Sequence, residues 1–125
     1  MKVAVTAQDG TLDAEVDPRF GRCSFFVIVD PETMTCEAVR NESAGAGSGA
    51  GVQAGQLVAE QDVRFVLTGN CGPNAFKVCE AAGIKVITDV SGTVRDAVEK
   101  LKNHEYSVSD GPSVGPHHGM RDQSE

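Results

Sequence analysis

Two arginines and a cysteine stand close together near the N-terminus, in a pattern that could bind an anion. Residues 17–23 read DPRFGRC, which places Arg19 and Arg22 three residues apart in a chain with a formal charge of −7. A guanidinium group presents several N–H donors to an oxyanion, and a diffuse charge to larger and softer anions. A solvated loop would explain the run equally well, with each arginine paired to one of the three carboxylates in residues 13–17.

A run of glycine, alanine and serine over residues 43–51 offers a second anion site. Ser43, Gly45, Ala46 and Gly47 belong to a segment too rich in glycine for the interior of a helix or strand, and a helix is expected to follow it. Unhindered N–H groups at a helix start bind anions. The loop lacks the ending of a Walker A motif and does not follow the first strand, so neither ATP nor NAD binding is supported. A flexible connector is the alternative.

A third candidate is the segment Asn70, Cys71, Gly72, Pro73 and Asn74. Proline is favoured as the first residue of a helix, so the thiol is predicted to lie just before a helix N-terminus. The helix dipole can lower the pKa of a thiol there and favour the thiolate. A buried structural thiol is the alternative.

The four cysteines show neither a CxxC pair nor the spacing of a zinc site. Disulfides are not expected in the reducing cytoplasm. We expect Cys36 to pack on the apolar face of a strand and Cys79 to lie in the core. Cys23 and Cys71 are expected in loops beside a crevice, where they would be alkylated before the other two.

Catalytic constellations are missing from the sequence. The histidines are His104, His117 and His118, and all follow the last expected core helix, so no general base is available in a crevice. The first expected strand carries no acidic residue for a two-metal site. An enzyme is therefore the weaker class of function.

The composition favours one acidic, water-soluble domain. The chain has 125 residues, of which 40% are hydrophobic, and it has no tryptophan. Its acidic balance argues against nucleic acid and anionic membranes as partners. No apolar run approaches the roughly 18 residues of a membrane span. An acid at Asp9 interrupts any signal-peptide core, so a cytoplasmic location is expected. A monomer is expected as well.

Strand and helix patterns alternate along the first hundred residues. Strands are expected at 2–7, 24–30, 34–41, 64–68 and 84–88, and helices begin at Val52, at Pro73 and after the cap Thr93. This order fits a three-layer α/β fold with helices on both faces of a five-stranded mixed sheet. The first, fourth and fifth strands should be parallel and the second antiparallel to the first. All three candidate loops then lie at the carboxyl edge of the first strand, where such sheets bind ligands.

A change in composition divides the chain into a domain over residues 1–103 and a flexible polar tail over 104–125. The tail carries His117, His118 and Met120, whose imidazole and thioether groups suit copper. They are candidate metal ligands that could deliver Cu(I) to the crevice. The alternative is a disordered tail with incidental histidines.

Several motifs together resemble the dinitrogenase iron–molybdenum cofactor biosynthesis family. They are DPRFGR at 17–22, FFVIVD at 25–30, GAG at 45–47, TGNCGPNAF at 68–76 and AGIKV at 82–86. The resemblance implies a ribonuclease H-like sheet and a protein that carries a metal–sulfur cluster without catalysing a reaction. One branch of the family handles precursors of the nitrogenase cofactor. Another holds a molybdenum–copper sulfide cluster without covalent attachment.

One departure from the nitrogenase branch is informative. That branch tends to read His-Phe-Gly-Ser-Cys where this chain reads RFGRC over residues 19–23, so Arg19 stands in place of a candidate metal-ligating histidine while Cys23 matches the cysteine. Guanidinium groups favour charge complementarity over coordination. An anionic thiometallate, whose sulfides already saturate its metals, would suit such a site. The resemblance therefore favours a molybdenum–copper cluster, with a related molybdenum- or iron-containing sulfide cluster as the wider class.

Two functions from different classes follow. The first is a non-catalytic carrier of an anionic metal–sulfide cluster, with cluster-assembly or ATPase proteins as possible partners. The second is a regulatory or adaptor module that binds a small anion or nucleotide and acts through a protein partner. The candidate cofactor-binding residues are Arg19, Phe20, Gly21, Arg22, Cys23, Ser43, Gly45, Ala46, Gly47, Asn70, Cys71, Gly72 and Asn74.

Overall fold

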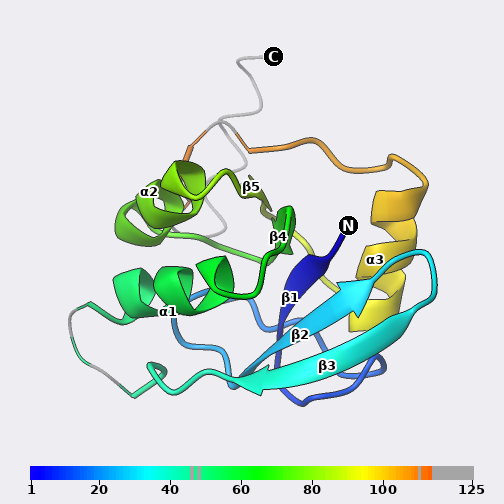
Figure 1. The fold of residues 1–125 in the computed structure, drawn as a ribbon, viewed down its shortest axis with the longest axis horizontal. Coiled ribbons are helices and arrows are strands. Elements are labelled where there is room, and N and C mark those ends of the chain that lie inside the picture. Colours follow the sequence, from blue (N-terminus) through cyan, green and yellow to red (C-terminus); the bar gives the residue numbers. More distant parts are fainter. Residues whose placement is uncertain (46, 48, 110, 114–125) are drawn as a thin grey trace.

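The protein is an α/β fold with a five-stranded sheet and three helices (Figure 1). The structure is a computed structural model and describes residues 1–45, 47, 49–109 and 111–113. Its elements, in chain order, are β1 (Val3–Ala7), β2 (Phe25–Asp30), β3 (Thr35–Arg40), α1 (Ala50–Ala59), β4 (Phe65–Leu67), α2 (Pro73–Ala81), β5 (Lys85–Ile87) and α3 (Val94–Lys102). No helix in these ranges has both the length and the apolarity needed to cross a bilayer.

The sheet has the strand order β3-β2-β1-β4-β5. β1 is parallel to β4, with Val5 opposite Leu67, and β4 is parallel to β5. β2 is antiparallel to both β1 and β3. The predicted strand directions are therefore confirmed. The chain leaves β1, β3, β4 and β5 at the same edge of the sheet, so the loops that follow these strands gather there.

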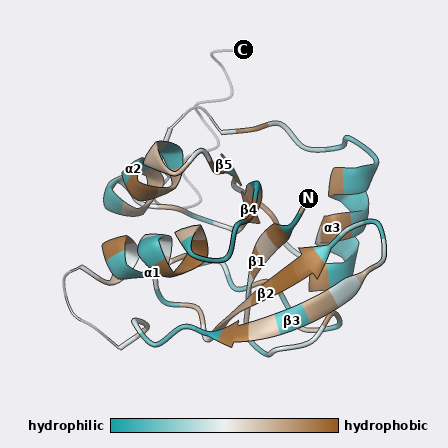
Figure 2. Ribbon diagram, in the orientation of Figure 1, coloured by the Kyte–Doolittle hydropathy of each residue, from teal (hydrophilic) through white to brown (hydrophobic). Residues whose placement is uncertain are grey.

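Helices cover both faces of the sheet (Figure 1). α1 and α2 pack on the face that presents Ala4, Phe26 and Val66, while α3 packs on the face that presents Val5 and Leu67. Figure 2 shows β2 as largely hydrophobic, whereas each helix alternates between hydrophobic and hydrophilic residues. The two-sided burial explains why the central strands are continuous apolar runs without alternation.

Local signals account for the helix boundaries. The Thr93 side chain accepts a hydrogen bond from the backbone N–H of Asp96 at 3.1 Å and caps α3, as predicted. Pro73 is the first residue of α2, and Gly83 follows that helix with a φ of 78°, which glycine adopts without strain. α1 begins at Ala50, two residues before the predicted start, because Gly49 adopts a left-handed conformation and turns the chain into the helix earlier.

The segment after α3, expected to be a tail from residue 104, packs against the domain over its described part. We call residues 105–109 and 111–113 the C-terminal strap; it runs from α3 back toward β5 (Figure 1, orange). The Ser109 N–H donates to the Val86 carbonyl at 2.8 Å, and the Ser109 and Thr88 hydroxyls lie 2.9 Å apart. Ser113 is buried. These contacts could not be predicted from the polar composition of the segment. The strap is joined to the domain by hydrogen bonds more than by apolar packing, so it carries no hydrophobic pattern.

Candidate functional site

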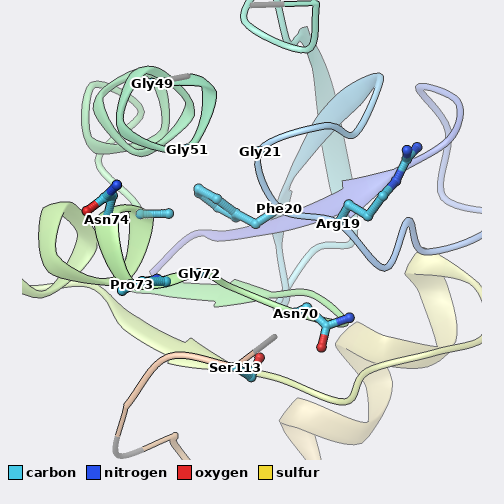
Figure 3. Close-up of a pocket in the computed structure, with 11 residues that line it drawn as sticks. Arg19, Phe20, Gly21, Gly49, Gly51, Asn70, Gly72, Pro73, Asn74 and Ser113 are labelled. Carbon is cyan, nitrogen blue, oxygen red and sulfur yellow. The ribbon is translucent and has the colours of Figure 1, made fainter. Parts of the chain in front are cut away.

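A cavity of about 410 Å³ lies where the loops after β1, β3 and β4 meet (Figure 3). It is lined by Arg19, Phe20, Gly21, Gly49, Gly51, Asn70, Gly72, Pro73, Asn74, Ala75 and Ser113. Among the described residues that line it, Arg19 is the charged one and none is a carboxylate. In a chain with a formal charge of −7, a described lining with a guanidinium and without a carboxylate favours an anion.

Two helix N-termini meet at this cavity. α1 begins after Gly49 and α2 begins after Gly72, so both N-cap residues are glycines without a side chain that could cap the helix. The helices pack closely along their length: a Cβ added at Gly51 would lie 3.4 Å from the Ala75 Cβ, and one at Gly55 would lie 2.9 Å from Val78. Backbone N–H groups and the positive ends of two helix dipoles therefore gather beside one space.

Backbone hydrogen bonds fix the loop after β1 to the end of β4. The Asn70 N–H donates to the Pro18 carbonyl at 2.7 Å, and the Phe20 N–H donates to the Asn70 carbonyl at 3.1 Å. The Phe20 ring packs on Phe26 with 5.3 Å between centroids. This ring is buried and points toward Asn74 in Figure 3, so it forms a rigid wall of the cavity.

Arg19 forms an ion pair with a buried carboxylate. Its Nε lies 3.3 Å from Oδ1 of Asp17, and its backbone N–H donates to the same oxygen at 2.9 Å. The hydrogen bond and the charge of Asp17 raise the pKa of Arg19. The Arg19 side chain is 63% exposed and extends away from Phe20 in Figure 3. The alternative considered in the sequence analysis, an arginine paired with a nearby carboxylate, therefore holds for Arg19, which lies at the rim of the cavity.

Arg22 holds the glycine-rich loop. Its guanidinium donates to the Ala44 carbonyl at 3.1 Å and to the Gly47 carbonyl at 3.3 Å. Arg22 therefore contacts the loop that leads into α1, and it is absent from the residues that line the cavity. In this structure it acts as a positioning residue for that loop.

The buried side-chain amide of Asn41 connects the loop after β1 to the glycine-rich loop. The Asn41 Nδ2 donates to the Cys23 carbonyl at 2.9 Å and to the Gly21 carbonyl at 3.2 Å. Its Oδ1 accepts from the Ser43 hydroxyl at 2.6 Å, and that hydroxyl also lies 3.4 Å from the Ala50 carbonyl. Ser43 thus positions the start of α1. Sequence reasoning missed Asn41, which falls at the end of a strand pattern with no motif to mark it.

The cysteines are arranged differently from the expectation. Cys23, Cys71 and Cys79 are buried, and Cys36 is exposed. The prediction that Cys36 packs on an apolar face is wrong. The three helices do not extend over the edge strand β3, and most side chains of this strand face solvent. Burial, together with the charge of Asp17, raises the pKa of Cys23 to about 12. Burial also raises the pKa of Cys71 to about 12 and that of Cys79 to about 11.

The structure therefore reverses the expected order of cysteine reactivity. Under native conditions iodoacetamide should label Cys36 first, with the other three at least about tenfold slower because they must wait for an opening of the fold. Mass spectrometry after brief treatment would measure the order. As a control, Cys36→Ser protein should take up three labels in urea and almost none in its native state. Labelling of Cys71 as fast as Cys36 would contradict this arrangement.

The predicted binding residues divide into two groups. Six line the cavity: Arg19, Phe20, Gly21, Asn70, Gly72 and Asn74. Six others lie in the surrounding loops but not in its lining: Arg22, Cys23, Ser43, Gly45, Gly47 and Cys71. Ala46, His117, His118 and Met120 lie outside the described residues.

Five lining residues were missed: Gly49, Gly51, Pro73, Ala75 and Ser113. The first four fall within or beside the motifs already singled out, so motif boundaries could have included them. Ser113 has no sequence signal. No group of three histidine, cysteine or acidic side chains suited to a metal ion occurs within the described ranges.

Comparisons with known proteins agree with this architecture. Residues 1–104 match the family model described as dinitrogenase iron-molybdenum cofactor. The apo form of the orange protein from Desulfovibrio gigas is 43% identical, with a TM-score of 0.88, over 90% of this chain and 96% of that one. The NMR structure of a putative NifB protein from Thermotoga is 31% identical, with a TM-score of 0.73, over 86% of this chain and 91% of that one.

A curated relative supports the same assignment. An uncharacterized protein of Methanocaldococcus jannaschii is 32% identical over 89 residues, which make up 69% of this chain and 72% of the relative. The family model spans most of the chain and includes every element of the sheet and all three helices. The chain belongs to the dinitrogenase iron-molybdenum cofactor family.

Proposed function

We propose that this protein is a non-catalytic carrier of an anionic metal–sulfide cluster, held in the cavity at the carboxyl edge of the sheet. The observation that carries the proposal is the convergence of two helix N-termini, each with glycine as its N-cap, on a cavity whose described lining residues include Arg19 and no carboxylate. Similarity to the orange protein favours a molybdenum–copper sulfide cluster within this class, with a related molybdenum- or iron-containing cluster as the wider assignment.

The donors around the cavity suit a preformed anion better than a bare metal ion. Cys23 and Cys71 are protonated and buried at neutral pH, which supports binding without a bond from protein sulfur to metal. Backbone N–H groups and a guanidinium can instead donate hydrogen bonds to sulfides, whose negative charge they complement. The protein's own contribution is thus to bind, orient and shield the cluster.

The proposal extends to the fold classification, the oligomeric state and the partners of the protein. The sheet order with an antiparallel second strand supports a ribonuclease H-like classification. A monomer in the cytoplasm that exchanges its cluster with assembly or ATPase proteins is consistent with a small carrier. The alternative function is a regulatory module that binds phosphate or a nucleotide, and the same helix N-termini favour it.

Absorption spectroscopy tests the proposal and separates the two functions. Metal-free protein should bind tetrathiomolybdate, and addition of Cu(I) should then produce new visible absorption that stays with the protein on gel filtration. Inorganic phosphate at the same concentration should not displace the molybdenum species. Binding of phosphate or a nucleotide, with no retention of tetrathiomolybdate, would overturn the carrier proposal in favour of the regulatory module.

The same titration tests the predicted copper ligands His117, His118 and Met120. A chain ending at Ser113 keeps the described strap and removes these three residues. If they capture Cu(I), the shortened chain should form the coloured species more slowly when copper is limiting, and equally fast when copper is in excess. Equal rates at limiting copper would assign these side chains no part in assembly.

A further inference from the structure

The C-terminal strap reaches the cavity through Ser113. This residue is 2% exposed and lines the cavity. Its N–H donates to the Cys71 carbonyl at 2.7 Å, and its Oγ accepts from the Cys71 N–H at 3.1 Å, across 42 positions of sequence. Figure 3 shows Ser113 beside the segment that carries Asn70 and Gly72. The paired backbone contacts hold its side chain in one place.

The hydroxyl proton of Ser113 has no acceptor in the described part of the chain. The Oγ atom takes part in one hydrogen bond, and it is the acceptor in that bond. By contrast, the Ser109 hydroxyl on the same strap is paired with Thr88. Buried hydroxyl groups in native proteins usually donate as well as accept. A buried donor at the wall of a cavity is therefore poised for an acceptor that enters the cavity.

We propose that Ser113 is an anion-binding residue of this cavity, and that its Oγ–H donates to a sulfide or oxygen atom of the bound anion. The inference rests on the proposed function and deepens it, because it adds a hydroxyl donor to the helix N-termini on the same wall. The strap is then part of the binding site. The backbone of Cys71 orients this donor, because its carbonyl accepts from the Ser113 N–H and its N–H donates to the Ser113 Oγ.

The test measures the Kd of tetrathiomolybdate for wild-type protein and for Ser113→Ala, Ser113→Thr and Ser109→Ala. Ser113→Ala should raise the Kd about tenfold, because a hydrogen bond to the anion is lost. Ser113→Thr keeps a hydroxyl and should bind with nearly the wild-type Kd. Ser109→Ala removes a hydroxyl from the same strap away from the cavity and should bind like wild type. The Tm of each metal-free protein is measured in parallel.

The outcomes separate this inference from the proposed function. If wild type binds tetrathiomolybdate and Ser113→Ala binds it equally well, Ser113 is not a binding residue while the carrier proposal stands. If Ser113→Ala and Ser109→Ala lose affinity in proportion to a lower Tm, the hydroxyl is only structural and the inference is overturned. If wild type binds neither tetrathiomolybdate nor phosphate, the proposed function fails, and this inference with it.

Discussion

Protein in which both Arg19 and Arg22 are replaced by alanine should bind tetrathiomolybdate about ten- to a hundredfold more weakly than wild type. Arg19 is the charged residue among the described members of the cavity lining, and Arg22 holds the loop that leads into α1. The substitutions lower the positive charge beside the anion and release the Ala44 and Gly47 carbonyls. A charge-assisted hydrogen bond from Arg19 to the anion would contribute about 1.5–3 kcal/mol, and we use the lower end because this side chain is 63% exposed. Loss of the loop contacts of Arg22 accounts for the rest of the expected effect.

Single substitutions separate charge from loop geometry. Arg22→Lys keeps the charge but has no planar fork to donate to two carbonyls, so it should lose more affinity than Arg19→Lys. Binding to wild type should weaken as salt rises, and the double alanine variant should respond less to salt because fewer charges take part. Equilibrium titration at several salt concentrations measures both effects.

Arg95→Ala is the matched control for net charge. Arg95 lies on α3, is paired with Asp13 at 3.1 Å, and is absent from the cavity lining. Arg95→Ala removes one positive charge, as Arg19→Ala or Arg22→Ala alone does. Its affinity for tetrathiomolybdate should stay within about twofold of wild type. If Arg95→Ala weakened binding as much as Arg19→Ala, the effect would come from overall charge, and the rim would have no special role.

Gly69→Ala should lower the free energy of unfolding by about 2 kcal/mol or more. A Cβ at this position would lie 2.6 Å from the Pro18 Cα and 2.8 Å from the Pro18 carbonyl oxygen. These are backbone atoms, so the clash cannot be relieved by rotating a side chain. Relief would require the loop after β1 to move away from β4, which would break the hydrogen bond from the Asn70 N–H to the Pro18 carbonyl.

Urea unfolding of metal-free protein measures this effect. Gly72→Ala is the control for stability, because a Cβ there would meet no atom of the described residues within 4 Å apart from its chain neighbours, and the residue has a φ of −70°. That variant should unfold within about 0.5 kcal/mol of wild type. If Gly69→Ala unfolded at the same urea concentration as wild type, the close approach of Pro18 to β4 would not be a structural constraint of the site.

The parts of the fold that the sequence predicts are those with strong local signals. Continuous apolar runs marked the central strands, while Pro73, Gly83 and Thr93 marked helix ends. These signals depend on backbone geometry and burial within a few residues. Chain direction then followed from the handedness of the crossovers, which is why six of the predicted residues converge on one cavity.

The errors arose where long-range contacts decide the outcome. Alternation in β3 identified an apolar face for Cys36, but it could not show that no helix reaches far enough to cover that face. The polar composition after Asn103 concealed Ser113, whose partners lie 42 positions away on Cys71. Arg22 was selected for its charge, yet its described contacts are to carbonyl oxygens of a neighbouring loop. Local patterns carry none of this information.

The strap also determines how copies of the protein could associate. Val86 is the middle residue of β5, and its carbonyl is occupied by Ser109, so this border of the sheet offers little backbone for a further strand. At the opposite border, β3 has no described strand on its outer side. Among the described residues, β3 therefore offers more open backbone than β5, and any association by strand addition is expected to use β3.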